Sequence, residues 1–351
     1  MSESPAALGY RMPAEWELHS ATWLTWPHNP ETWPGQNMQK VEKEFLAIVR
    51  HLAIHETTHI IISEEKLESS ISSTLKSEGV IMDNIIFHKI PTNDSWIRDY
   101  GPNFIIKDEK GSRKLAANHW DFDSWGKKYE WKLDDIAGKA ITEKLELQHF
   151  RTDIVLEGGA IDVNGLGTCI TTKSCIMNPN RNNNISLENM EKILEEHLGI
   201  SKIIWLSGKI EGDDTDGHID NIARFVDHQK IVCAVEENKN DPNYMHLKAN
   251  YQHLKTSTDQ DNNPLEIISV PMPGYIGNQK MRLPASYLNF YISNKSVLVP
   301  VFDDPKDDNA ISILTPLFPN REIIPIPSRT LIWGLGSVHC LTQQQPLNKI
   351  V

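Results

Sequence analysis

Short strand-like runs alternate with helical stretches along the 351-residue chain. The runs are rich in isoleucine and valine and fall at 58–62, 84–87, 202–206, 230–234, 296–301 and 321–326. Between them, apolar residues at helical spacing predict helices over 38–52 and 187–198, the second with Ser186 as its cap and Gly199 as its end. This alternation predicts a mixed α/β fold whose helices each pack one face on a sheet.

The composition is that of a globular chain without obvious subdivision. Hydrophobic residues make up 39% and charged residues 23%, and no run of about 18 apolar residues occurs, so no membrane span is expected. Residues 1–6 lack the features of a secretory signal, and we expect a cytoplasmic protein. The polar segments 178–184 and 259–264 have the character of loops rather than linkers. We therefore expect one domain over residues 1–351.

The net charge of −12 indicates which class of binding partner is favoured. Nonspecific nucleic-acid binding depends on clustered lysines and arginines that neutralise phosphates, so this chain is a poor candidate for it. The summed negative field favours a cationic small molecule instead. The sequence leaves open whether the chain forms a homo-oligomer.

Four cysteines are too few and too scattered for a disulfide framework, and no C-x-x-C pair suggests zinc. Cys169, Cys175 and Cys233 lie in apolar or strand-like surroundings, where a buried, unreactive thiol is the common case. Cys340 differs because it follows the glycine-rich turn 334–336. Glycine permits a positive φ, so we expect this turn to present the Cys340 thiol as a nucleophile.

His218 and Asp220 follow Gly217 in an acid-rich segment. In an extended segment both side chains would point to the same face, where the imidazole can move a proton and the carboxylate can orient it or bind a cation. An ordinary acidic surface loop is the competing interpretation. A calcium loop is excluded, because Gly217 as its sixth position would place Gly212 and Ala223 where Asp and Glu are required. No third ligand with supporting spacing is apparent, so we expect neither a metal nor a cofactor.

Two further carboxylates stand in suggestive surroundings. Asp99 follows Trp96 by three residues, and a carboxylate beside an indole suits a flat, delocalised cation. The alternative is an internal ion pair of Asp99 or Asp94 with Arg98. Glu157 precedes the glycine pair 158–159 after an apolar run, so we expect it at a strand end where backbone can approach a ligand. An exposed acid at a turn is the competing interpretation.

The candidate residues are spaced 51 to 69 residues apart, from Asp99 through Glu157, Asp220 and Asn289 to Cys340. This spacing suggests a repeat of about sixty residues, each copy delivering a side chain to a common centre. A thiol, an imidazole and several carboxylates together suit a guanidinium group. Carboxylates can hold its N–H fork, the thiolate can attack its central carbon, and a histidine can protonate the departing ammonia.

The chain resembles the agmatine deiminases and, more broadly, the bacterial peptidyl-arginine deiminase family of guanidine-modifying enzymes. The resemblance rests on motifs that occur in the same order over nearly the whole chain: 12–16, 23–27, 93–102, 156–159, 217–221, 286–291 and the loop around Cys340. It implies a five-bladed α/β propeller of ββαβ repeats, the pentein fold, with pseudo-fivefold symmetry and an active site at its axis. One departure is Leu335, where relatives often have a third glycine.

The resemblance also implies roles for individual residues. Cys340 would be the nucleophile, His218 the general acid and base, and Glu157 a carboxylate that works with His218. Asp99 and Asp220 would bind the guanidinium group. Further substrate contacts are implied for Trp96, Asn289 and Asp214.

The implied reaction is hydrolysis of agmatine to N-carbamoylputrescine and ammonia, a step of putrescine biosynthesis. Free arginine or peptidyl-arginine as substrate, an amidinotransferase, a metal-dependent hydrolase and a noncatalytic ribosome-binding propeller are the alternatives. Only Arg98 and Arg282 offer positive charge near the motifs, which favours agmatine over a substrate that carries a carboxylate. We expect Trp23, Trp26 and Trp120 as candidates for contact with the far end of the substrate.

Overall fold

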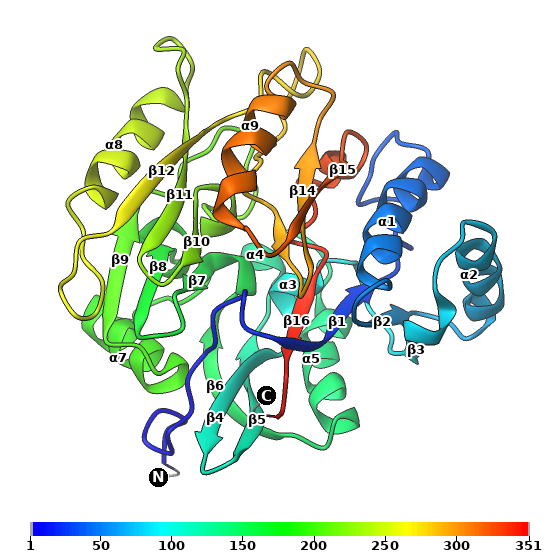
Figure 1. The fold of residues 1–351 in the computed structure, drawn as a ribbon, viewed down its shortest axis with the longest axis horizontal. Coiled ribbons are helices and arrows are strands. Elements are labelled where there is room, and N and C mark those ends of the chain that lie inside the picture. The colour runs from blue at the N-terminus through cyan, green and yellow to red at the C-terminus, as the bar shows by residue number, and fades with distance from the viewer. Residues whose placement is uncertain (1–2, 350–351) are drawn as a thin grey trace.

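The computed structural model describes residues 3–349 and contains five small sheets arranged in a ring, with the longer helices outside it (Figure 1). In four of the sheets the first strand is antiparallel to the second, and the third is parallel to the second. The parallel pair requires a crossover connection, which a helix supplies in each case. Each unit therefore has the order ββαβ, and the expected five-bladed α/β propeller is confirmed.

The four three-stranded units follow one another along the chain. They are β4 (Asn103–Glu109), β5 (Ser112–Asp121), α5 (Lys132–Lys144) and β6 (Gln148–Val155); β7 (Ile161–Val163), β8 (Thr168–Thr172), α7 (Leu187–Leu198) and β9 (Lys202–Leu206); β10 (Ala223–Asp227), β11 (Lys230–Val235), α8 (Tyr244–Leu254) and β12 (Glu266–Pro271); and β13 (Tyr291–Ile292), β14 (Ser296–Val301), α9 (Asp307–Leu314) and β15 (Glu322–Pro327).

The fifth unit joins distant parts of the sequence and closes the ring. Its members are β16 (Gln343–Pro346), β1 (His19–Thr25), α1 (Met38–Leu52) and β2 (Thr57–Ile62), followed by the additional α2 (Lys66–Ser77) and β3 (Ile85–Lys89). β16 is antiparallel to β1, while β1, β2 and β3 are parallel. Figure 1 shows the red β16 lying beside the blue β1.

Short helical segments occupy the connections. They are α3 (Ile97–Tyr100), α4 (Ser124–Lys127), α6 (Lys173–Ile176), η1 (Met82–Asn84), η2 (Gly158–Ala160), η3 (Ile219–Asn221), η4 (Thr315–Leu317) and η5 (Leu331–Gly334). In Figure 1, α3 lies near the middle of the ring, away from the outer helices.

The two helices expected from periodicity are confirmed at both ends. In α7 the Ser186 side chain accepts a hydrogen bond from the Asn189 amide, and Gly199 ends the helix with a left-handed φ of 65°. In α1 the apolar stripe is buried except for Met38, which is partly exposed, and Leu46 is buried in addition. The six expected strands occur as β2, β3, β9, β11, β14 and β15, each displaced by two residues or fewer at its ends.

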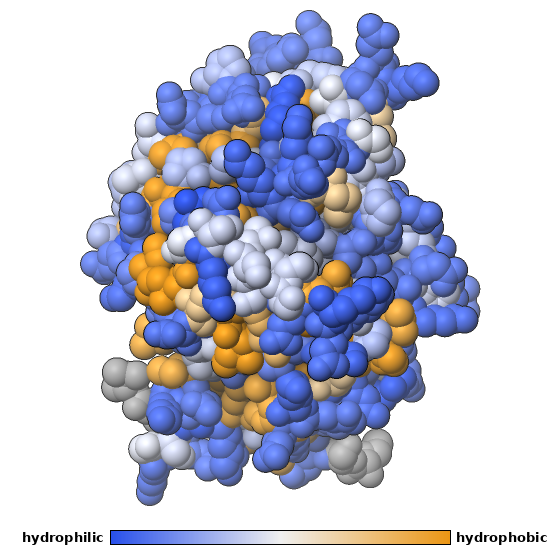
Figure 2. All heavy atoms as spheres, turned by 90° about the vertical axis from the view of Figure 1, so that its right-hand side faces the viewer, coloured by the Kyte–Doolittle hydropathy of each residue, from blue (hydrophilic) through white to orange (hydrophobic). Residues whose placement is uncertain are grey.

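The apolar faces of the helices and sheets pack in the spaces between them. The largest core cluster includes Trp23, Phe45 and Leu298 and joins the closing unit to its neighbours. Hydrophilic side chains cover most of the face seen in Figure 2, with apolar atoms visible between them. Over residues 3–349, no helix combines the length and the apolar character that crossing a bilayer requires.

Candidate active site

The predicted site residues occupy equivalent points of the five units. Each stands two to four residues before the first strand of its unit: Asp99 before β4, Glu157 before β7, Asp220 before β10, Asn289 before β13 and Cys340 before β16. The regular spacing in the sequence therefore follows from the ββαβ repeat. Five separate units contribute to one centre.

Cys340 lines a pocket of about 610 Å³ and is only 6% exposed. The Asn289 Nδ2 group donates to its Sγ atom at 3.2 Å, and Asp220 Oδ2 lies 3.7 Å from the same sulfur. Burial raises the pKa of the Cys340 thiol well above its ordinary value, and the carboxylates of Asp220 and Asp99 raise it further. The thiol therefore retains its proton at neutral pH while the pocket is empty of substrate.

The turn before Cys340 differs from the expectation. Leu335, not Gly334 or Gly336, has the positive φ, at 68°. A Cβ atom at either glycine would lie 2.7 Å from the Trp96 ring, so the glycines are required by close packing on the indole. The left-handed conformation of Leu335 costs about 1–2 kcal/mol relative to a right-handed one.

Asp99 lies in α3 and is held by two donors. The Gly159 amide donates to Oδ1 at 2.9 Å, and Trp125 Nε1 donates to Oδ2 at 3.0 Å. His218 Nδ1 lies 3.7 Å from Oδ1. The competing ion pair between Asp99 and Arg98 is not present, because the Arg98 guanidinium bonds to other residues.

The glycine pair after Glu157 permits the close approach that was expected there. A Cβ atom at Gly159 would lie 2.5 Å from His218 Nδ1 and 2.9 Å from Asp99 Oδ1, and one at Gly158 would collide with the Arg98 carbonyl. Any larger residue at position 159 would displace the side chains that converge there.

His218 and Asp220 do not lie on the extended segment that was predicted. His218 directly precedes the 3₁₀ helix η3, and Asp220 lies within it. Asp220 does not orient His218, whose carboxylate partner in an ion pair is Asp99. Burial alone would lower the pKa of His218, but the carboxylates of Asp99, Glu157 and Asp220 outweigh burial and raise it. The imidazole is therefore more readily protonated than an exposed one.

Glu157 is positioned by Arg181, which lies in the predicted polar loop 178–184. Arg181 Nε donates to Glu157 Oε1 at 2.5 Å, and its Nη1 group donates to Asp216 Oδ2 at 2.6 Å. Its Nη2 group donates to the Thr215 carbonyl at 2.9 Å. The only available signal was a single arginine among the asparagines of 178–184. Arg181 thereby links Glu157 to the segment that carries His218.

Asp220 is held by His339, the residue before the cysteine. His339 Nδ1 lies 2.8 Å from Asp220 Oδ2, and Nε2 lies 2.8 Å from Glu15 Oε2. Burial would raise the pKa of Asp220, but its hydrogen bond to His339 and the nearby positive charges lower it. Asp220 is therefore ionised over the neutral range. Neither His339 nor Glu15 had been assigned a role from the sequence.

A buried ionic network extends from His339 away from the pocket. Arg224 pairs with Glu15 at 3.0 Å and with Asp162, and it donates to backbone carbonyls. Arg98 donates to Gln344 Oε1 at 2.7 Å and lies 3.5 Å from Glu15. We call this set, Glu15, Arg98, Asp162, Arg224 and His339, the ionic network.

The walls of the pocket are acidic and aromatic. Its acidic lining residues are Glu31, Asp94, Asp99, Glu130 and Asp214, and its aromatic ones are Trp96, Trp125, Tyr129 and Trp333. No lysine or arginine is among the lining residues in the described part of the chain. At the rim, the Tyr129 hydroxyl donates to Asp214 Oδ2 at 2.7 Å, and Lys128 lies 3.4 Å from Oδ1.

The tryptophans expected at the far end of the substrate are elsewhere. Trp23 is fully buried and stacks on His59, and Trp26 donates to Glu42. Trp120 lines a separate cavity of about 10 Å³ behind Asp99. Helix-like and strand-like apolar patterns do not distinguish a core indole from a pocket indole, so Trp125 and Trp333 were overlooked.

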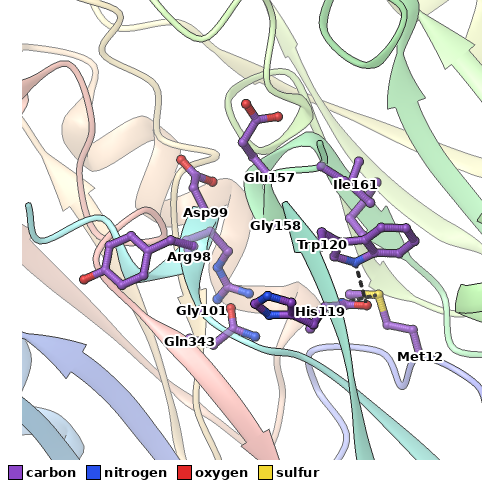
Figure 3. Close-up of a pocket in the computed structure, with 13 residues that line it drawn as sticks. Met12, Arg98, Asp99, Gly101, His119, Trp120, Glu157, Gly158, Ile161 and Gln343 are labelled. Atoms are coloured by element: carbon purple, nitrogen blue, oxygen red, sulfur yellow. Dashed lines mark hydrogen bonds between the residues drawn. The ribbon is translucent and has the colours of Figure 1, made fainter. Parts of the chain in front are cut away.

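The small cavity adjoins the substrate pocket, because Asp99 lines both. It is lined by residues that include Asp99, Glu157, His119 and Gln343. In Figure 3 the carboxylates of Asp99 and Glu157 lie on the side of the view away from His119 and Gln343. The cavity has room for about one water molecule.

Comparison with known proteins identifies the family. The model of the Porphyromonas-type peptidyl-arginine deiminases matches residues 11–346. The chain belongs to this family. The resemblance inferred from the motifs is thereby confirmed. Curated agmatine deiminases of Ectopseudomonas mendocina and Pseudomonas aeruginosa are 35% and 36% identical to it, over 99% and 98% of this chain and 98% of each relative.

Solved structures give the same relationship. An agmatine deiminase of Enterococcus faecalis has a TM-score of 0.90 at 28% identity, covering 99% of this chain and 98% of that one. A C. jejuni agmatine deiminase with substrate bound has a TM-score of 0.86 at 28% identity, covering 97% of both chains. An amidinotransferase from Microseira wollei, with a TM-score of 0.51 at 12% identity over 97% and 99% of the two chains, shares the fold alone.

Proposed function

We propose that this protein hydrolyses agmatine to N-carbamoylputrescine and ammonia. Full-length similarity to curated agmatine deiminases supports the reaction. The observation that carries the choice of substrate is the lining of the pocket, where a thiol stands among five carboxylates and no lysine or arginine occurs among the described lining residues. Such a pocket suits a molecule that is cationic at both ends, because none of its described lining residues offers a positive charge to an α-carboxylate.

Binding would place the guanidinium group beside Asp99 and Asp220, within reach of the Cys340 sulfur. Asp220 Oδ2 is 3.7 Å from that sulfur, so a carboxylate that grips the N–H fork also directs the central carbon toward it. The indole of Trp96, packed on the glycine turn, provides a flat surface for the cation. Asn289 orients the thiol through its 3.2 Å contact.

The chemistry follows from the charges. The bound guanidinium offsets the carboxylates that raise the thiol pKa, so the Cys340 thiolate forms mainly in the substrate complex. The thiolate attacks the central carbon, and the imidazolium of His218 gives its proton to the departing ammonia. A thiouronium remains on Cys340. The neutral imidazole then takes one proton from water as the water oxygen attacks the same carbon. The carbon–sulfur bond breaks to give N-carbamoylputrescine, and the second water proton passes to the sulfur, which restores the thiol that lost its proton to solvent when the substrate bound.

The distal ammonium of agmatine would lie toward the rim, where Asp214 stands with Tyr129. Glu157 supports His218 through its negative charge and is itself held by Arg181. Each residue assigned from the motifs thus has a contact that suits its role.

The test is ammonia release with agmatine and with arginine side by side, for the wild type and for Cys340→Ala. We expect turnover of agmatine alone, and loss of at least about 10³-fold in the variant. Preference for arginine would overturn the substrate while retaining the mechanism. Undiminished activity in Cys340→Ala would overturn the mechanism.

A further inference from the structure

Cys175 was expected to be an ordinary buried thiol, and it is buried within an apolar cluster, but a carboxylate also lies beside its sulfur. Its sulfur lies 3.8 Å from Glu157 Oε2. The donor atoms of Glu157, Cys175 and His218 all lie within 4.8 Å of one another. A thiol, an imidazole and a carboxylate at such separations are the donor set that Zn²⁺ and similar thiophilic cations prefer.

The ring of His218 has unused bonding capacity at this place. It is 1% exposed, and neither ring nitrogen has a hydrogen-bond partner among the described residues. A buried imidazole without partners is costly, because burial removes water from both nitrogens. Glu157 also retains capacity, since Arg181 bonds to Oε1 and leaves Oε2 facing the Cys175 sulfur.

The local charge favours a dication. Asp99, Asp213 and Asp220 all act on His218 together with Glu157, whereas Arg181 is the positive group that acts on Cys175. Negative charge therefore exceeds positive charge around the three donors. A divalent cation would reduce that excess in a region from which water is largely excluded.

The geometry requires only small adjustments. Ligand atoms of a tetrahedral zinc ion lie roughly 3.3–3.6 Å apart, given metal–ligand bonds of about 2.0–2.3 Å. The distance of 3.8 Å between the Cys175 and Glu157 atoms is already close to this. The remaining donor atoms must approach by about 1 Å, which side-chain rotation can supply, and a water molecule would complete the coordination.

We propose that Glu157, Cys175 and His218 form a binding site for a thiophilic divalent cation of the zinc class. Binding forms one metal–sulfur, one metal–nitrogen and one metal–oxygen bond, and releases the Cys175 thiol proton, and that of His218 where it is protonated, to solvent. The site differs from the substrate pocket in that it uses Cys175 rather than Cys340.

Occupation of this site would inhibit the enzyme. This consequence rests on the proposed function, because the cation would take the imidazole that moves protons and the carboxylate that supports it. His218 lies 3.7 Å from Asp99, which lines the pocket, so a guanidinium held by Asp99 would stand close to the metal. The two cations repel each other, and agmatine should raise the apparent inhibition constant of the metal.

Metal binding can be measured without turnover. The catalytic thiol is first removed with Cys340→Ala, so that any remaining thiolate signal comes from another cysteine. Titration with Cd²⁺ should then produce the ultraviolet charge-transfer band of a cadmium thiolate at one equivalent. Adding Cys175→Ser should abolish the band, whereas the matched buried change Cys233→Ser should retain it. No band in Cys340→Ala, or an equal band after Cys175→Ser, would overturn the site.

Inhibition is measured separately on the enzyme with Cys340 intact. We expect Zn²⁺ to inhibit the wild type and Cys233→Ser alike, and Cys175→Ser to raise the inhibition constant at least about tenfold relative to its own metal-free activity. Equal inhibition of both variants would contradict the proposal. Thermal unfolding of each variant verifies its fold, with Cys175→Ala as the second substitution if serine destabilises it. Cadmium binding without agmatine turnover would uphold the metal site while refuting the proposed function.

Discussion

Glu15 and Asp99 are buried carboxylates in neighbouring parts of the molecule, and their surroundings are opposite. Burial would raise the pKa of Glu15, but Arg224, His339 and Arg98 together hold it well below its usual range. Burial also raises the pKa of Asp99, and there the charge of His218 does not suffice to reverse the rise. The ionic network neutralises its own charges, whereas the pocket keeps negative charge available for a ligand.

The two regions are built from adjacent residues. Arg98 belongs to the ionic network and Asp99 lines the pocket; His339 belongs to the network and Cys340 lines the pocket. One member of each pair thus anchors the backbone from which the other extends. The comparison predicts that substitutions in the pocket reduce activity at little cost in stability, and that substitutions in the network do the reverse.

The largest effect is expected for Asp99→Asn. It removes the charge that we propose to bind the guanidinium, so kcat/KM for agmatine should fall by at least about 10³-fold. The free energy of unfolding should change by less than about 1 kcal/mol, because relief from the repulsion of neighbouring carboxylates offsets one weakened hydrogen bond. Steady-state kinetics and urea unfolding check both. A loss of stability above 3 kcal/mol, on the order of a broken buried ion pair, would contradict the comparison.

Glu15→Gln should show the opposite pattern and lower the free energy of unfolding by about 3–5 kcal/mol, because buried arginines lose their partner. The folded-state pKa of Glu15 is lowered, so its contribution is present above the unfolded-state pKa and is lost as the pH falls through the folded-state pKa. The difference in stability between wild type and variant should therefore shrink on acidification. A constant difference between neutral pH and acid, measured by urea unfolding, would argue against this assignment.

Arg181→Gln should lower kcat for agmatine by about 10²-fold, because Glu157 and the segment before His218 lose a common anchor. Arg181→Lys retains the positive charge but lacks the several N–H donors of the planar guanidinium, so it should recover only part of the rate. The pH profile of kcat separates this from a general structural loss, since its basic limb, set by His218, should move. Unchanged limbs in both variants would show that Arg181 does not act through the acid–base pair.

Asp214→Asn should have a smaller effect, raising KM for agmatine by about tenfold with little change in kcat, because it alters a partly exposed carboxylate at the rim. Asp261→Asn, on a distant polar loop, is the matched control. A decrease in kcat equal to the increase in KM would place Asp214 at the reacting end of the substrate instead.

The sequence predicted the repeat and the centre better than the surroundings of the centre. One site residue stands before the first strand of each of the five units. Because the units are of similar length, these residues are regularly spaced in the sequence, and the spacing predicts the repeat. The residues of the ionic network have no regular spacing in the sequence. Glu15 and Arg224 are 209 residues apart and meet only because the ring closes.

Local conformation was predicted less well than position. Gly334 and Gly336 were expected to supply a positive φ. Both are instead required to be glycine by close packing on the indole of Trp96, which lies 238 residues before Gly334 in the sequence. The extended segment expected at His218 is a helical turn for a similar reason: Gly217, with a φ of 112°, packs against Gly208. Tertiary contacts of this kind override a pattern of a few residues.

The pairing of β16 with β1 has a consequence for the newly made chain. Cys340 stands three residues before β16, so the proposed nucleophile reaches its place only when β16 is synthesised and joins β1. The acids and the imidazole are all made earlier. A polypeptide interrupted before Cys340 would therefore carry the proposed binding groups without the sulfur, and under the proposed function a growing chain would release no ammonia until β16 had joined β1.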